Sequence, residues 1–195
     1  MTPQSTMPQP VTLRFKVDDY YKMIELEMLE NYERAEIIEG ELIKNMPIGN
    51  RHAACVEKLN ELLRDELGKT VSLRNQQTIK FDDYNEPQPD LAILTRREDF
   101  YSQAAPTPKD ALILIEVSDS TLKYDRDKKL PLYAEAEIPE VWVVNLTNEI
   151  VEVHTKPSVG LYQLVKIFKR GEILETETLP NLSLNVDDIL SQKKR

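Results

Sequence analysis

One almost wholly apolar run, residues 111–117 with the sequence ALILIEV, constrains the fold more than any other segment. Such a run fits a strand that is covered on both faces, as in a sheet with helices on each side. Residues 125–136 follow with helical spacing despite Pro131, and residues 141–145 (VWVVN) return as a second buried strand. Strand, helix and strand in this order predict a crossover unit in a central sheet.

Apolar periodicity on both sides of this unit predicts further elements. These are helices over residues 18–31 and 52–67 and strands over residues 35–45 (turning at Gly40), 70–81, 88–94, 150–154 and 162–168. The predicted fold class is therefore α/β (α+β), a central mixed β-sheet flanked by helices with extra antiparallel strands at the C-terminal end.

Length and composition predict one domain. A chain of 195 residues with 41% hydrophobic residues can bury a proper core. Residues 1–12 are rich in proline and residues 191–195 are polar and basic, so we expect two poorly ordered tails around a single domain over residues 13–190.

Charge and cysteine content exclude several classes of protein. Twenty-five Lys and Arg against 34 Asp and Glu give a net charge of -9, so any nucleic-acid contact needs a local basic patch. The candidates are Arg96-Arg97, Lys128-Lys129 and residues 166–170 and 193–195. One cysteine and two histidines exclude an internal disulfide and a Cys- or His-rich zinc site, while oxygen-ligated metals stay open. With no apolar run near the roughly 20 residues of a membrane span, we expect a cytoplasmic protein without membrane contact.

Two acidic residues lie in or next to apolar segments, where burying a charged side chain costs free energy. Glu116 interrupts the apolar run, where an ionisable group needs a partner or a metal, although an acid near a strand end can also face solvent or an arginine. Asp90 begins another apolar segment directly after Pro89, and Pro-Asp is also ordinary turn chemistry. Two such acids on neighbouring strands can face one cleft.

A basic residue follows on the predicted crossover helix. Lys129 and Tyr133 stand four residues apart, so they share a helix face that could lean the ammonium over the two carboxylates. The alternative is a solvated, salt-bridged face that Lys129 forms with Asp125 and Asp127.

Together these motifs resemble a known family. Gln-Pro-Asp-Leu-Ala at 88–92, Ile-Glu-Val-Ser at 115–118, and residues 124–136 and 138–145 are similar to the large bacterial family of restriction endonuclease-like domains of unknown function. That family belongs to the PD-(D/E)XK nuclease superfamily, and the likeness runs from about residue 32 to residue 190.

The resemblance implies roles for individual residues. Asp90 and Glu116 match the two acids that hold Mg²⁺, with Mn²⁺ as a substitute, and Glu41 matches an early acid that completes the metal site. Ser118 stands where the superfamily usually has its lysine, and Lys129 matches the lysine of this family. Its ammonium would orient the attacking water or stabilise charge on the phosphate.

Further residues receive supporting roles. The resemblance implies support from Tyr133, Gln76 and His52, although His52 could instead pack on the hairpin as an N-terminal helix residue. The residues expected to be structural are His154, Cys55 and Trp142.

The expected function is that of a Mg²⁺-dependent endonuclease that hydrolyses phosphodiester bonds in DNA and acts as a homodimer. One alternative is a non-catalytic module on the same scaffold that binds nucleic acid or protein, which the acidic net charge favours. Another is a purely structural interaction protein.

Overall fold

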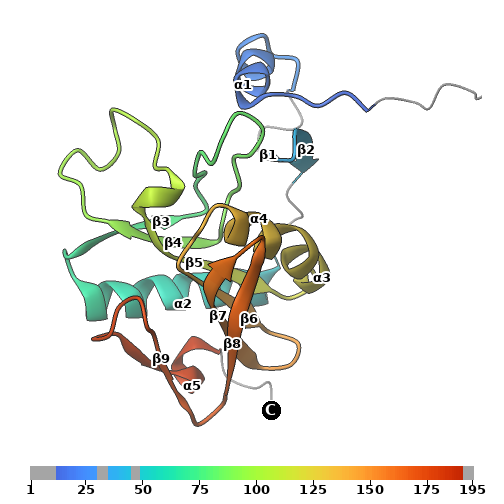
Figure 1. Cartoon of the computed structure of the whole chain (residues 1–195). Coiled ribbons are helices and arrows are strands. Elements are labelled where there is room, and N and C mark those ends of the chain that lie inside the picture. Colours follow the sequence, from blue (N-terminus) through green and yellow to red (C-terminus); the bar gives the residue numbers. More distant parts are fainter. Residues whose placement is uncertain (1–11, 30–34, 45–48, 191–195) are drawn as a thin grey trace, which may run out of the picture.

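The computed structural model describes residues 12–29, 35–44 and 49–190, and its centre is a six-stranded mixed sheet (Figure 1). The strand order is β3-β4-β5-β6-β7-β8; β5 and β6 are parallel and the other neighbouring pairs are antiparallel. The bounds are β3 Val71–Asn75, β4 Leu91–Thr95, β5 Ala111–Ser118, β6 Glu140–Asn145, β7 Ile150–Ser158 and β8 Leu161–Lys169.

The crossover between β5 and β6 is a continuous helical segment in three parts. It consists of α3 (Leu122–Tyr124), a π-helical turn η2 (Asp125–Lys129) and α4 (Leu130–Glu135). Pro131 lacks an N–H, and in a regular α-helix its ring would clash with the carbonyl four residues earlier. The wider turn avoids that clash, and the Leu130 N–H bonds to the Asp125 carbonyl five residues back.

The two faces of the sheet are covered by different elements. Helices α2 (Asn50–Leu67) and α5 (Val186–Ile189) share one core cluster with Ile115 and Val117 of β5. Leu114 of the same strand packs in a second cluster with Leu130 and Tyr133 of the crossover segment. Figure 1 shows α2 along one side of the sheet and the α3–α4 segment on the other. Helices on both faces explain why β5 is almost wholly apolar.

The N-terminal elements form a small unit beside this sheet. Helix α1 (Val17–Glu25) packs on the hairpin of β1 (Ala35–Ile38) and β2 (Glu41–Lys44). Glu39 and Gly40 connect the two strands with φ of 53° and 75°, as a two-residue hairpin turn requires. A Cβ on Gly40 would lie 2.6 Å from the Arg14 Cβ, so this turn needs glycine. The remaining elements are η1 (Pro108–Asp110) and the antiparallel pair β9 (Ile173–Glu175) and β10 (Ser183–Asn185).

The structure confirms the predicted fold class and corrects two strand boundaries. The strand predicted over 70–81 ends at Asn75, because Gln76 has a φ of 48° and leaves the extended conformation. The strand predicted over 88–94 begins only at Leu91, after Pro89, which has no N–H for a ladder. Apart from Thr12, the tails predicted at 1–12 and 191–195 lie outside the described residues, as do the basic residues 193–195. None of the described helices is both long and apolar enough to cross a membrane.

The packing of α2 on the sheet is testable. Leu59 is fully buried between the helix and β5, so we expect Leu59→Ala to lower the free energy of unfolding by about 2–5 kcal/mol through lost burial and the cavity left behind. Leu26→Ala, at a side chain that is 70% exposed, is the matched control and should change it by less than about 0.5 kcal/mol. Urea denaturation of both variants measures this, and equal effects would contradict the described packing.

Candidate active site

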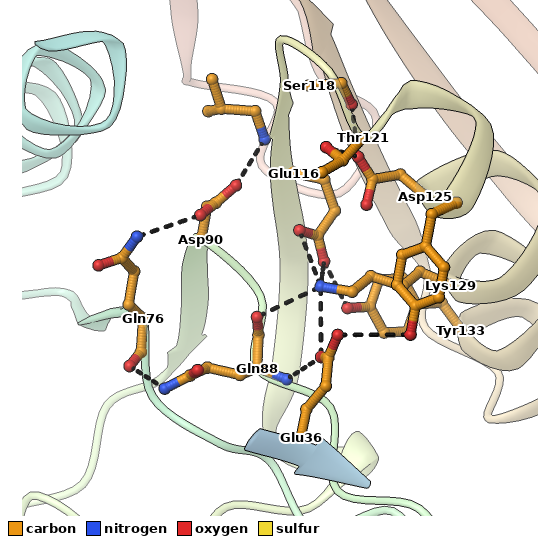
Figure 2. Close-up of polar contacts among 12 residues, drawn as sticks. Glu36, Gln76, Gln88, Asp90, Glu116, Ser118, Thr121, Asp125, Lys129 and Tyr133 are labelled. Carbon is orange, nitrogen blue, oxygen red and sulfur yellow. Dashed lines mark hydrogen bonds and ion pairs between the residues drawn. The ribbon is translucent and has the colours of Figure 1, made fainter. Parts of the chain in front are cut away.

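Glu116 lies at the centre of a buried polar cluster. The side chain is 3% exposed, and alternation along β5 turns it away from α2 and toward the crossover segment. The Lys129 ammonium lies 3.2 and 3.3 Å from its two carboxylate oxygens, and the Tyr133 hydroxyl donates a hydrogen bond of 2.5 Å to Oε1 (Figure 2). The strand acid that the sequence singled out therefore has the lysine and tyrosine predicted to accompany it.

The Lys129 ammonium is surrounded by oxygen atoms from three parts of the chain. Besides the Glu116 carboxylate, Nζ lies 3.3 Å from Oε2 of Glu36 on β1 and 3.4 Å from the carbonyl oxygen of Gln88. The Gln88 N–H in turn donates to Glu36 Oε2 at 3.0 Å. The ammonium thus links the hairpin, the segment before β4 and the crossover helix.

Asp90 lies one residue before β4 and beside the Glu116 strand. Its Oδ2 accepts the backbone N–H of Val117 at 2.9 Å and lies 3.0 Å from His52 Nε2. Its Oδ1 accepts from the side chain of Gln76 at 3.3 Å. Pro89 has no N–H that could pair with β5. The Asp90 carboxylate instead binds the backbone of β5 at Val117, and this places it next to Glu116.

Electrostatics distinguish the two acids. Burial raises the pKa of the Asp90 carboxyl, but hydrogen bonds from His52 and Val117 outweigh it and lower the pKa below its ordinary value. Burial raises the pKa of Glu116 well above its ordinary value, with repulsion from Asp125 and Asp90 adding to it. The site carries more acid than its cations neutralise, and a bound cation would relieve that repulsion.

The pKa of Lys129 moves the opposite way to that of an isolated buried lysine. Burial alone disfavours the ammonium, yet the carboxylates of Glu116 and Glu36 raise the pKa above its ordinary value. Lys129 therefore stays charged although its side chain is only 8% exposed.

Asp125 is a fourth acid at this site, and the sequence analysis assigned it only to a solvated face. It is buried, and its Oδ2 accepts from the hydroxyls of Ser118 at 2.7 Å and Thr121 at 2.8 Å. Ser118, at the position of the superfamily's usual lysine, thus binds the start of the crossover segment. Asp125, Lys129 and Tyr133 recur every four residues, and that spacing is the signal that could have identified Asp125.

The structure does not bring Glu41 into this cluster. Glu41 lies on β2 with an exposed side chain, whereas Glu36 on the paired strand is 2% exposed and contacts Lys129. Ala35 and Ile37 pack on α1, so Glu36 takes the opposite side of the strand, toward the sheet. An acid in the apolar stretch AEII was the available signal, the same kind that marked Glu116.

Comparison with known proteins identifies the family. The Uma2 family, described as "Putative restriction endonuclease", matches residues 17–187. The chain belongs to this family. A crystal structure described as a putative nuclease belonging to DUF820 from Anabaena variabilis ATCC 29413 matches with a TM-score of 0.68 and 18% identity, covering 90% of this chain and 97% of that one. That likeness shows the fold. No curated protein matched the chain.

The donor atoms of this Uma2 chain fit a hard divalent cation. Asp90, directly before β4, and Glu116 on the neighbouring strand β5 offer carboxylate oxygens, and Mg²⁺ is usually bound through one or two carboxylates with water in the remaining positions. Among the described residues, no three His, Cys, Asp or Glu side chains come together as a complete metal site. Two carboxylates plus water would therefore be the ligand set.

Within the described part of the chain, five of the basic residues predicted to contact phosphate form ion pairs with carboxylates of the same chain. Arg97 pairs with Asp99, Lys128 with Glu39, and Lys129 lies in the cluster. Lys166 pairs with Glu177, and Arg170 pairs with Glu149 and Asp187. Nucleic acid would have to compete with these carboxylates for the basic side chains.

The residues expected to be structural lie outside the cluster. Cys55 is buried, and burial raises the pKa of its thiol to about 12, which keeps it neutral. Trp142 is fully buried, and its Nε1 donates to Glu140 at 2.6 Å. His154 lies on β7, 3.3 Å from Glu152, which also pairs with Arg126.

The His52–Asp90 pair gives a pH-dependent signal. The hydrogen bond to Asp90 raises the pKa of His52 above its ordinary value, so we expect an imidazole pKa above about 6.5 that falls in Asp90→Asn. Because the folded pKa is the higher one, the pair's contribution to stability is complete below about pH 6.5 and is lost as pH rises through the folded pKa.

An NMR titration of the imidazole resonances measures this shift. Asp119→Asn, at a half-exposed carboxylate that pairs with Arg51, is the control and should move the His52 pKa far less. An unchanged His52 pKa in Asp90→Asn would contradict the pairing.

Proposed function

We propose that this Uma2 chain is a Mg²⁺-dependent endonuclease that hydrolyses phosphodiester bonds in DNA. The observation that carries the proposal is the position of Asp90, directly before β4 and bonded to Val117 of β5, beside Glu116 with the buried ammonium of Lys129 on its carboxylate. Family membership supports the reaction class, since the family is described as "Putative restriction endonuclease".

Asp90 and Glu116 would hold the metal ion. When bound, Mg²⁺ supplies Lewis acidity toward a phosphate and a nucleophile at neutral pH. The protein's part is to keep the two carboxyl groups in place. His52, Gln76 and the Val117 N–H orient Asp90, and Tyr133 holds one oxygen of Glu116 by a hydrogen bond.

Lys129 would supply fixed positive charge next to the metal ligands. A buried ammonium acts in a low-dielectric setting, where it stabilises the negative charge that develops on the phosphate more strongly than in water. Glu36 on β1 and the carbonyl oxygen of Gln88 also contact Nζ, so they act as positioning residues rather than as reacting groups. Lys129, which replaces the lysine at the superfamily's usual position, is thus held in place by Glu36 and Gln88.

The competing proposal is a binding module without turnover. The ion pairs that engage Arg97, Lys166 and Arg170 favour weak, salt-sensitive contact with nucleic acid over tight nonspecific binding. Salt-dependent DNA binding that needs no metal and yields no product would support this reading over the enzyme.

The catalytic assignment predicts a specific pattern of lost activity. Asp90→Asn, Glu116→Gln and Lys129→Ala should each lower the cleavage rate of plasmid DNA in Mg²⁺ by about 100-fold or more, because each removes a charge from the reaction centre. EDTA should abolish cleavage. Lys123→Ala, at an exposed lysine of the same crossover segment that pairs with Asp127, is the control and should cleave at the wild-type rate. Circular dichroism checks that each variant is folded, and wild-type cleavage by folded Asp90→Asn would refute the assignment.

Glu36 and Glu41, on the two paired strands of the hairpin, provide a second test. Glu36→Gln should lower the cleavage rate by about tenfold or more, since it removes a charge-assisted hydrogen bond to the Lys129 ammonium. Glu41→Gln should have a smaller effect, because its exposed side chain lies on the other strand of the hairpin. Parallel rate measurements decide between them. The reverse order would restore Glu41 as the early acid of the site.

A further inference from the structure

The loop that follows β4 (light green in Figure 1) holds an aromatic ring in solvent against an arginine. Phe100 is 64% exposed, and the Arg96 guanidinium lies 4.2 Å from the centre of its ring. The next ring, Tyr101, is buried in the core, and its hydroxyl donates a hydrogen bond of 2.7 Å to the carbonyl oxygen of Thr95. Tyr101 thus anchors the loop while Phe100 stays outside the core.

Arg74 of β3 extends this surface toward the candidate active site. It lies opposite Ala92 of β4, which packs with Tyr101 on the crossover side of the sheet, and its guanidinium is 5.8 Å from the centre of the Tyr101 ring. Residues directly opposite each other on paired strands share a face. Asp90 precedes Ala92 by two residues, so Arg74 lies about 7 Å along the strand from the level of Asp90.

Two of the arginines on this surface lack a carboxylate partner in the described part of the chain. Arg97 pairs with Asp99, whereas no described acid forms an ion pair with Arg74 or Arg96. Arg74 donates only to the side-chain oxygen of Gln77, at 2.6 Å, and burial lowers the pKa of its guanidinium because lost hydration is not replaced by an anion. A phosphate would supply that anion to both guanidinium groups.

We propose that Arg74, Arg96 and Phe100 bind a single strand of DNA that continues from the candidate active site, with phosphates at the two arginines and a base stacked on the exposed ring. Cationic and aromatic side chains together are the usual contacts to unpaired strands, since every base has a π-face. The choice of ligand rests on the proposed function. The proposal adds that the substrate has unpaired nucleotides within about 20 Å of the scissile bond, the length of strand from Asp90 to Arg96.

Fluorescence anisotropy of a labelled single-stranded oligonucleotide, titrated with the full chain in Ca²⁺ at several salt concentrations, tests the phosphate contacts. We expect Arg74→Ala and Arg96→Ala each to raise Kd about tenfold and to reduce the slope of log Kd against log salt by about 0.7, as for one phosphate contact. Arg64→Ala is the matched control and should change neither. Arg64 is exposed on α2, on the opposite face of the sheet, and its Nε donates to Asn60.

The same titration tests the base contact. Phe100→Ala should raise Kd about fivefold or more with an unchanged salt slope, because stacking carries no charge. Ile173→Ala, at a comparably exposed side chain (61%) on β9, is its control. Glu98→Gln should lower Kd about twofold or more, since it removes an exposed acid of the same loop that repels phosphate. Misfolding would not produce such a gain.

The outcomes separate this proposal from the proposed function. A wild-type chain that does not bind the oligonucleotide, or arginine variants with the wild-type Kd and salt slope, would overturn it. A duplex that binds as tightly as the single strand would overturn the unpaired base. Binding that requires Arg74 and Arg96 in a chain that cleaves no DNA would support this proposal and refute the proposed function. Cleavage by a chain whose arginine variants bind normally would do the reverse.

Discussion

The ion pair of Lys129 with Glu116 and Glu36 is the interaction on which the candidate site depends. It joins the crossover segment, the central sheet and the N-terminal hairpin at one buried ammonium. Removing one partner from such a pair leaves an unpaired buried charge and typically lowers the free energy of unfolding by about 3–5 kcal/mol. The three side chains therefore stabilise the fold only together. Under the proposed function, the same burial would keep water away from the charges and strengthen their effect on a phosphate group.

The fold creates this site by ending strands rather than by extending them. β3 stops at Gln76, whose left-handed backbone turns its side chain to Asp90, and β4 starts only after Pro89 and Asp90. The Asp90 carboxylate then binds the N–H of Val117. Gln76 is one of nine described non-glycine residues with a positive φ, and its side chain contacts the proposed metal ligand Asp90. The π-helical turn of the crossover, widened beside Pro131, similarly ends at Lys129.

Sequence patterns predicted the crossover unit and brought forward Asp90, Glu116 and Lys129, because each has a local signal: an acid in an apolar strand, or a lysine at helical spacing from a tyrosine. They did not resolve which acid of the hairpin faces the sheet. Glu36 and Glu41 lie on paired strands close together in sequence, and only the packing of Ala35 and Ile37 on α1 turns Glu36 inward. Asp125 was hidden in a charged run that resembled a solvated face. Strand ends were misplaced where backbone dihedrals, and not hydrophobicity, decide the boundary.

Under the proposed function, Asp90 and Glu116 together hold a divalent cation. Soaking crystals of the protein in Mn²⁺ and measuring anomalous diffraction above the manganese edge tests this assignment. We predict one anomalous peak coordinated by an oxygen of each carboxylate, and no peak in Asp90→Asn crystals treated in the same way. A wild-type site without a peak, or a peak bound by neither carboxylate, would contradict the account.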